Sequence, residues 1–201
     1  MENPSEHLKL KAGLVSTADR EKRFDQKAVT ILLTGLTGSG KSTLAAALEK
    51  RLFDAGRAVA VLYGQNMRQG LSRDLGFSAD DRSENLRRSA EVAKILNDAG
   101  LICICAFVSP HEAVRQRAKQ VIGADRFIEV YLSAPVEVCR QRDMSGIYKL
   151  ADAGIIASFP GVSAAFEKPG NADLVIATEQ VEVEMAVDAI LDLMIKRRWF
   201  V

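Results

Sequence analysis

Short apolar runs alternate with longer amphipathic segments along this 201-residue chain. The apolar runs are rich in Val, Ile and Leu and have the length of buried strands. The segments between them repeat apolar residues at three- and four-residue spacing, which predicts helices. We expect strands at residues 28–33, 58–63, 101–107, 127–132 and 173–177, and helices at residues 42–56, 85–99, 110–121, 135–142 and 182–196.

This alternation predicts a three-layer α/β fold, with a parallel sheet, helices on both of its faces and right-handed crossovers. No internal repeat, low-complexity tract or linker divides the chain. We therefore expect a polar lead-in at residues 1–27, in which residues 16–23 favour a helix, and a single domain at residues 28–201. Ligands of such folds bind at the carboxyl ends of the strands.

Two of the expected helices carry capping signals at their starts. Asp81 and Glu84 have the spacing of a capping box ahead of the helix at 85–99. Ser109 precedes Pro110 and Glu112, the order of an N-cap, a first-turn proline and a capping glutamate. We therefore expect Ser109 to cap the helix that runs to about residue 121.

Composition excludes several classes of function. The chain has 27 Lys and Arg against 26 Asp and Glu, a formal net charge of +1, which argues against a nucleic-acid partner. Its apolar runs are too short to cross a membrane, and its polar, acidic start is unlike a secretory leader. Three cysteines without metal-ligand spacing predict reduced thiols, with Cys103 and Cys105 in the core, so we expect a cytoplasmic protein.

The strongest chemical signal is the stretch from Gly35 to Ser42, which matches the phosphate-binding loop GxxxxGK[ST] between an expected strand and an expected helix. Its glycines let backbone N–H groups approach a phosphate, and the helix adds the positive end of its dipole. Lys41 can reach the phosphate oxygens as a catalytic group, and the Ser42 hydroxyl can bind Mg²⁺. The sequence therefore predicts ATP and Mg²⁺ bound at Gly35, Thr37, Gly38, Ser39, Gly40, Lys41, Ser42 and Thr43.

A phosphate-binding loop alone fits kinases, GTPases and motor ATPases. The small size, the loop-rich stretch at 143–171 in the place of a lid, and arginines after the second strand favour a small-molecule kinase. Guanidinium groups match phosphate or sulfate oxygens, and Arg68 lies in the turn that follows the second expected strand. Arg87 and Arg88 are as well explained as solvated charges on a helix. The Asn-Lys-x-Asp signal of GTPases is absent.

An ordered series of motifs runs along the chain, at residues 35–43 (GLTGSGKST), 66–71 (NMRQGL), 74–78 (DLGFS), 81–88 (DRSENLRR), 106–110 (AFVSP), 127–131 (FIEVY), 139–143 (CRQRD) and 146–149 (GIYK). This series resembles the adenosine 5′-phosphosulfate (APS) kinase family, which phosphorylates the ribose 3′-hydroxyl of APS to give PAPS. The resemblance spans nearly the whole chain and is specific because the motifs occur in the family's order.

The resemblance implies roles for individual residues. Arg68, Arg82 and Asn85 would hold the phosphosulfate and ribose of APS, and Phe77 and Phe159 would border its adenine. Val108, Ser109 and the lid residue Lys149 would contact the acceptor, and Ser109 would also be a catalytic residue. Arg142 would contact the ATP. Core packing of the two phenylalanines and a solvated Lys149 remain alternatives.

The chain departs from the family at the end of the second strand. Where the family has Asp-Gly-Asp-Asn, this chain has Tyr63-Gly64-Gln65-Asn66. Neither a phenol nor an amide is a general base at pH 7. The lid also departs, with Met144-Ser145 and Ala164-Ala165-Phe166 in place of a Val-Lys pair and a Pro-Tyr neighbourhood.

Two hypotheses about function follow. The first is a working kinase that phosphorylates APS or another nucleotide-like acceptor. The second is a nucleotide-binding pseudokinase that regulates a partner. A homodimer and an association with an ATP sulfurylase are both left open.

Overall fold

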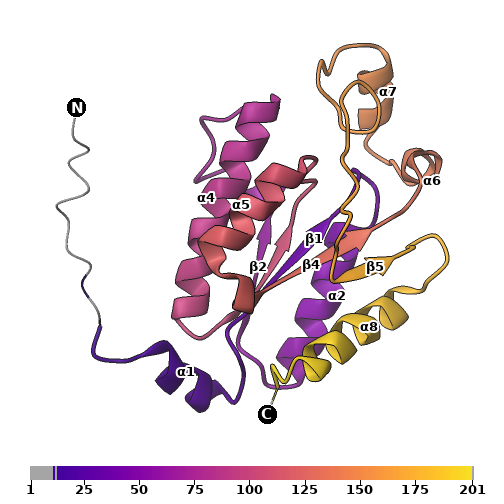
Figure 1. Cartoon of the computed structure of the whole chain (residues 1–201). Helices are drawn as coiled ribbons and strands as arrows, with labels where there is room; N and C mark the ends of the chain where they lie inside the picture. The colour runs from indigo at the N-terminus through magenta and orange to yellow at the C-terminus, as the bar shows by residue number, and fades with distance from the viewer. Residues whose placement is uncertain (1–10, 12, 201) are drawn as a thin grey trace, which may run out of the picture.

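The computed structural model describes residue 11 and residues 13–200, which form a parallel sheet between two layers of helices (Figure 1). The strand order is β2-β3-β1-β4-β5. All five strands were predicted from the apolar runs, with ends displaced by one or two residues at most. They are β1 (Thr30–Thr34), β2 (Val59–Tyr63), β3 (Ile102–Ala106), β4 (Phe127–Leu132) and β5 (Leu174–Ile176).

Helices α2 and α8 cover one face of the sheet, and α4 and α5 cover the other (Figure 1). The expected three-layer α/β fold is thereby confirmed. The bounds are α1 (Thr17–Phe24), α2 (Lys41–Asp54), α3 (Gly64–Met67), α4 (Ala79–Asp98), α5 (Glu112–Ile122), α6 (Val136–Gln141), α7 (Ile147–Asp152) and α8 (Val183–Lys196), with a short 3₁₀ turn at Ala124–Arg126.

Side chains of the central strand β1 alternate between two cores. Ile31 and Leu33 pack beneath α2 and α8, whereas Leu32 faces α4 and α5. The predicted core thiols Cys103 and Cys105 lie in the second core, buried and free, with their sulfurs 3.7 Å apart. This two-residue period is what a strand buried on both faces requires.

Helix α4 begins at Ala79, six residues before the expected start at residue 85. Its N-cap is Ser78, whose hydroxyl accepts from the Asp81 N–H at 3.1 Å while the Asp81 carboxylate accepts from the Ser78 N–H. The expected box of Asp81 with Glu84 was therefore wrong. A serine hydroxyl is the more favourable N-cap, and Glu84 is instead bound by Arg87 and Arg88.

The prediction that Ser109 caps α5 was also wrong. The helix begins at Glu112, its N-cap is His111, and that cap makes no side-chain hydrogen bond. The carboxylate of Glu167, far along the chain, accepts from the Glu112 N–H at 2.7 Å. A remote acidic side chain thus supplies the helix start with the acceptor that we had assigned to a local serine.

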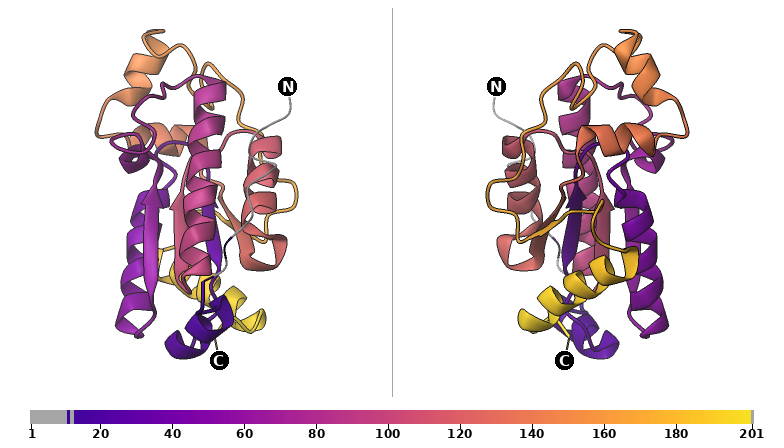
Figure 2. Two further views of the ribbon diagram at one scale, coloured as in Figure 1. Left: turned by 90° about the vertical axis from the view of Figure 1, so that its left-hand side faces the viewer. Right: turned by 90° about the vertical axis from the view of Figure 1, so that its right-hand side faces the viewer.

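The end of the lead-in packs against the amino end of the sheet. The amide of Gln26 donates to the carbonyls of Ala58 and Gly100 at 2.8 and 2.9 Å. Gln26 also pairs with Phe200, and Trp199 is buried in the core beneath α2 and α8. Figure 2 shows α1 at the opposite end of the molecule from α7. Residues 1–10 of the predicted lead-in, residue 12 and Val201 lie outside the described residues.

Residues 143–171, predicted to form a lid, contain α7 and loops beyond the carboxyl end of the sheet (Figures 1 and 2). Tyr148, Ala151 and Phe159 form a small core there with Cys139 of α6. None of the described helices is both long and apolar enough to span a membrane.

Candidate functional site

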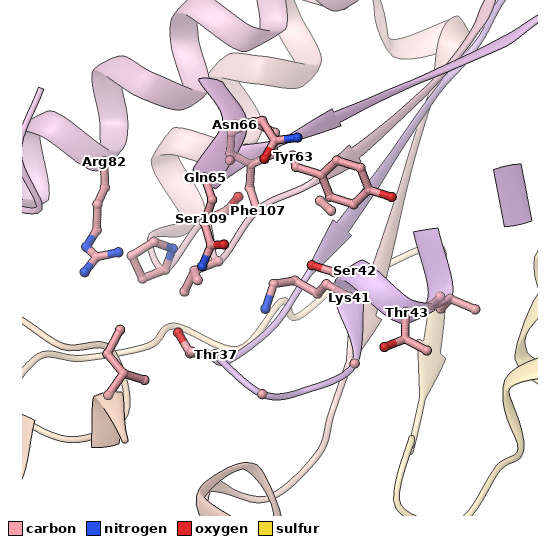
Figure 3. Close-up of a pocket in the computed structure, with 18 of the residues that line it drawn as sticks. Thr37, Lys41, Ser42, Thr43, Tyr63, Gln65, Asn66, Arg82, Phe107 and Ser109 are labelled. Atoms are coloured by element: carbon pink, nitrogen blue, oxygen red, sulfur yellow. The ribbon is translucent and has the colours of Figure 1, made fainter. Parts of the chain in front are cut away.

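A cavity of about 950 Å³ opens at the carboxyl ends of the central strands (Figure 3). Its walls come from the phosphate-binding loop at residues 35–42 (the P-loop), the segment after β2, α4, the loop after β3, the lid and the start of α8. Most of the predicted site residues line it: Thr37, Gly38, Gly40, Lys41, Ser42, Thr43, Arg68, Phe77, Arg82, Asn85, Val108, Ser109, Arg142 and Phe159.

The P-loop backbone packs so closely that two of its glycines admit no side chain. A Cβ on Gly35 would lie 2.6 Å from the Leu132 carbonyl oxygen, and one on Gly38 would lie 2.7 Å from that of Cys139. Gly38 and Gly40 also have left-handed φ angles of 82° and 95°. Gly40 directly precedes α2, so the amino end of that helix faces the cavity with its positive dipole.

Lys41 is buried at the floor of the cavity, with 9% of its surface exposed. Its ammonium group donates to the carbonyl oxygens of Gly35 at 2.9 Å and Leu36 at 2.6 Å. Burial lowers the pKa of Lys41 to about 8. The group is therefore mostly charged at pH 7, and a bound anion would raise its pKa again.

We expect nucleotide affinity to fall as the pH rises through 8. Below that pH Lys41 is charged and attracts phosphate, and above it the neutral amine loses that attraction. Because the anion favours the charged form, binding of ADP at pH 8 should take up about half a proton. Calorimetry in two buffers of different ionisation enthalpy measures this uptake. Lys41→Arg, which stays charged, is the control and should take up none; equal uptake by the two proteins would contradict the assignment.

A pair of arginines lies over Phe77 at the other end of the cavity. The guanidinium carbons of Arg68 and Arg82 are 4.7 and 5.4 Å from the centre of the Phe77 ring, which is 59% exposed. Arg82 also donates to the carbonyls of Phe77 and of Ser158 in the lid, at 3.0 and 3.1 Å. Burial lowers the pKa of both arginines, and the charge of Arg68 lowers that of Arg82 further. Two such cations side by side are suited to an anionic ligand.

Arg87 and Arg88, by contrast, are occupied by acidic partners. Both form ion pairs with Glu84, and Arg88 also pairs with Asp74 at 2.6 Å. Hydrogen bonds to these carboxylates raise the pKa of both arginines. This agrees with the interpretation of Arg87 and Arg88 as charges on the helix surface and separates them from Arg68 and Arg82.

Two buried polar atoms at the cavity lack hydrogen-bond partners among the described residues. They are the hydroxyl oxygen of Ser109 and the side-chain oxygen of Asn85. Asn85 donates through its amide nitrogen to the Gly64 carbonyl at 3.3 Å. Ser109 has a left-handed φ of 45°, uncommon for a residue other than glycine. Unsatisfied groups and strained backbone of this kind are concentrated at ligand sites.

No cavity-lining residue in the described part of the chain is acidic. Tyr63 and Gln65, where the resemblance leads us to expect aspartates, lie above Ser42 and Lys41 in Figure 3. Burial, and then the charge of Glu49, raises the pKa of Tyr63, so its phenol is neutral at pH 7. The Ser42 hydroxyl is one oxygen ligand of the kind that Mg²⁺ uses beside phosphate oxygens and waters, but the carboxylate that usually completes such a site has no counterpart among the described residues that line the cavity. The described residues contain no group of three His, Cys, Asp or Glu able to hold a metal.

Lid residues contact the P-loop directly. Tyr148 of α7 donates to the Thr37 carbonyl at 2.7 Å and packs edge-on against Phe159. Phe159 is 2% exposed, so it belongs to the lid core while it also lines the cavity. Lys149 is exposed and does not line the cavity. Gly35 and Ser39, which were predicted to bind the nucleotide, belong to the P-loop but do not line the cavity either. The role of Lys149 stays a prediction.

Sequence reasoning missed the wall that follows β5. The hydroxyl of Thr178 donates to the Ser39 carbonyl at 2.9 Å, and Arg142 donates to both the hydroxyl and the carbonyl of Thr178. The position of Thr178 just after an expected strand was a usable signal. Other lining residues that were missed, such as Ile156, Val181, Val183 and Ala186, are apolar and carried no such signal, whereas Phe107 and Ile147 lie within the motifs at 106–110 and 146–149 but were given no role.

Comparison with known proteins decides the family. Residues 27–177 match the family model described as adenylylsulphate kinase. The chain belongs to that family.

Two relatives differ in how much of their own length this chain covers. The chain is 50% identical to the adenylyl-sulfate kinase of Shewanella halifaxensis over 87% of its length and 86% of that protein. It is 53% identical to the bifunctional enzyme CysN/CysC of Rhodopirellula baltica over 90% of its length, but it spans only 28% of that protein.

Solved structures agree with the family. The APS kinase CysC of Mycobacterium tuberculosis, solved in complex with AMPPNP and APS, is 38% identical with a TM-score of 0.80, covering 84% of this chain and 98% of that one. The hexameric APS kinase of Thiobacillus denitrificans is 28% identical with a TM-score of 0.67, covering 92% of this chain and 32% of that one.

Proposed function

We propose that this protein is an adenylyl-sulfate kinase, which transfers the γ-phosphoryl group of ATP to the 3′-hydroxyl of APS. The observation that carries the proposal is the charge layout of one cavity. Lys41 and the amino end of α2 provide a cationic end, Arg68 and Arg82 provide a second one, and the unpartnered groups of Ser109 and Asn85 are available at the same cavity. A donor and an acceptor that are both anionic nucleotides require such a layout.

On the donor side, the P-loop amides and Lys41 would hold the phosphates and neutralise charge in the transition state. Arg142 is fixed by Thr178 at the edge of the cavity, where it would border the nucleotide. The Ser42 hydroxyl would contribute one ligand to a Mg²⁺ ion, which supplies further neutralisation of the phosphates when bound.

On the acceptor side, Arg68 and Arg82 would bind the phosphosulfate, and the exposed face of Phe77 would border the adenine. Ser109 and Asn85 would hydrogen-bond to the ribose, with Val108 beside them. The lid, which already contacts the P-loop through Tyr148, would exclude water so that the phosphoryl group reaches the hydroxyl.

The location and partners of the protein are part of the proposal. Free, buried cysteines fit a reducing compartment, so we place the enzyme in the cytoplasm. Its acceptor must come from an enzyme that joins sulfate to an adenylyl group. The fused CysN/CysC relative supports an association with such an ATP sulfurylase, and the hexameric relative supports self-association.

The test is a coupled assay of ADP release with ATP, Mg²⁺ and APS, together with chromatography of the product. We expect turnover that depends on APS and yields PAPS, with no comparable activity on AMP. ADP release that does not depend on APS, or that requires another acceptor, would overturn the proposal. An inactive protein that still binds both nucleotides would favour the regulatory pseudokinase instead.

Substitution of Arg82 tests the acceptor side. Arg82→Met should raise KM for APS about 10- to 150-fold, because a charge-assisted hydrogen bond contributes about 1.5–3 kcal/mol. KM for ATP should change less than threefold. Arg87→Met, on the same helix but paired with Glu84, is the matched control. Equal effects of the two substitutions on KM for APS would remove Arg82 from the acceptor site.

A further inference from the structure

Arg115 of α5 is the largest fully buried side chain in the described part of the chain. None of its side-chain surface is exposed, and it is not among the residues that line the cavity. Burial of a guanidinium group is costly unless its charge and its hydrogen-bond donors are satisfied. What Arg115 contacts therefore indicates its role.

Three contacts surround the guanidinium group. Its Nε atom lies 2.6 Å from the carboxylate of Glu129, an ion pair without hydrogen-bond geometry, and a second nitrogen pairs with Glu112. The third is a hydrogen bond from Nη1 to the backbone carbonyl of Ser109, 2.8 Å long and buried. One rigid, planar group thus joins two carboxylates to the residue at the cavity.

Glu129 anchors the guanidinium group of Arg115 to the sheet. It lies in β4 directly opposite Leu32 of β1, the strand that leads into the P-loop. Its N–H donates to the Asp173 carboxylate at 2.8 Å, and its carbonyl accepts from the Asp173 N–H at 2.9 Å. Burial raises the pKa of Glu129, and the charge of Arg115 opposes that shift.

The backbone of Ser109 has a conformation that other contacts must stabilise. Its φ of 45° costs conformational energy, and a residue keeps such a conformation only where its surroundings determine it. The neighbouring carbonyls are also held, Val108 by the Thr34 hydroxyl at 2.8 Å and Pro110 by the Glu167 N–H at 2.8 Å. Of the three successive carbonyls, that of Ser109 is the one that a buried charged side chain holds.

We propose that Arg115 is a positioning residue, which fixes the backbone of Ser109 so that its unpartnered hydroxyl faces the acceptor nucleotide. The proposal rests on the proposed function in naming that nucleotide as APS. Arg115 acts on the acceptor alone, because the P-loop that holds the donor is built from other contacts. Its loss should therefore affect the two substrates unequally.

The experiment removes the positioning contact without leaving a buried charge unpaired. Arg115→Met alone would strand the Glu129 carboxylate, so the variant to use is the double substitution Arg115→Met with Glu129→Leu. Replacing a buried ion pair by apolar side chains of similar volume is commonly neutral or stabilising. Arg117→Met, an exposed arginine on the same helix, is the matched control. Arg115→Lys, which keeps a charged donor opposite Glu129, tests rescue.

Calorimetry should show a Kd for APS at least tenfold weaker in the double variant, with the Kd for ADP unchanged. KM for APS should rise and kcat should fall while KM for ATP stays constant. Arg115→Lys should recover part of the APS affinity, and Arg117→Met should behave as wild type. These changes should appear in a protein whose thermal unfolding midpoint is close to that of wild type.

The proposal is overturned if the folded double variant binds APS within twofold of wild type, or if it loses affinity for APS and ADP alike. The proposed function fails separately, when wild-type protein binds APS but does not phosphorylate it. In that case the comparison of APS affinities still decides the role of Arg115. A wild-type protein that does not bind APS overturns both.

Discussion

Methionine in place of Lys41 should remove at least half of the thermal stabilisation that ATP gives to the protein. Lys41 is the cation at the floor of the P-loop, with its ammonium group on the carbonyls of Gly35 and Leu36. A hydrogen bond to a charged group contributes about 1.5–3 kcal/mol, so its loss should weaken ATP binding roughly 10- to 150-fold and remove half of the stabilisation or more. Wild type at a hundredfold excess of ATP over Kd should gain about 2.7 kcal/mol.

The same substitution should leave the nucleotide-free protein as stable as wild type, or more so. Burial lowers the pKa of Lys41, so the folded protein holds this charge at a cost that methionine avoids. Differential scanning fluorimetry with and without ATP measures both effects. Lys50→Met serves as control, since Lys50 lies on the same helix but is exposed and paired with Asp54. An ATP-induced shift equal to that of wild type would show that Lys41 does not contact the phosphates.

The strands and the P-loop could be predicted because their signals are local. An apolar run of strand length specifies a buried strand almost wherever it lies, and the spacing of Gly35, Gly40 and Lys41 specifies a loop by its own backbone requirements. The start of α4 was mispredicted because several acidic residues compete to cap it. The hydroxyl of Ser78 gives the better N-cap.

What could not be predicted depends on segments that meet only in the fold. The start of α5 is capped by Glu167, more than fifty residues away in sequence, and the buried Arg115 depends on Glu129 in another strand. Arg115 has the same residue type as the exposed Arg117 two positions later, and only tertiary packing separates them. The contact of Arg82 with the Ser158 carbonyl of the lid likewise joins segments that are far apart in the sequence.

Aspartate in place of Tyr63 should raise turnover of APS about 10²–10⁴-fold, the usual contribution of a positioned general base. Among the described residues that line the cavity none is acidic, so no carboxylate of the wild-type site can accept the proton of the attacking hydroxyl. The Tyr63 phenol cannot replace one, because burial raises its pKa. Steady-state kinetics of Tyr63→Asp should show the gain in kcat with little change in KM for ATP.

Tyr63→Asn is the control for this gain, since it matches aspartate in size and lacks its charge. If the carboxylate is the base, only the aspartate variant should be faster, and its rate should fall at acid pH as that carboxylate is protonated. Positioning and charge neutralisation carry most of phosphoryl transfer, so wild type can be active without a base. Equal rates for wild type, Tyr63→Asp and Tyr63→Asn would mean that Lys41 and the P-loop amides, together with the lid, suffice for the chemistry. The substitutions at 63 and 65 would then have removed acids that this site does not need.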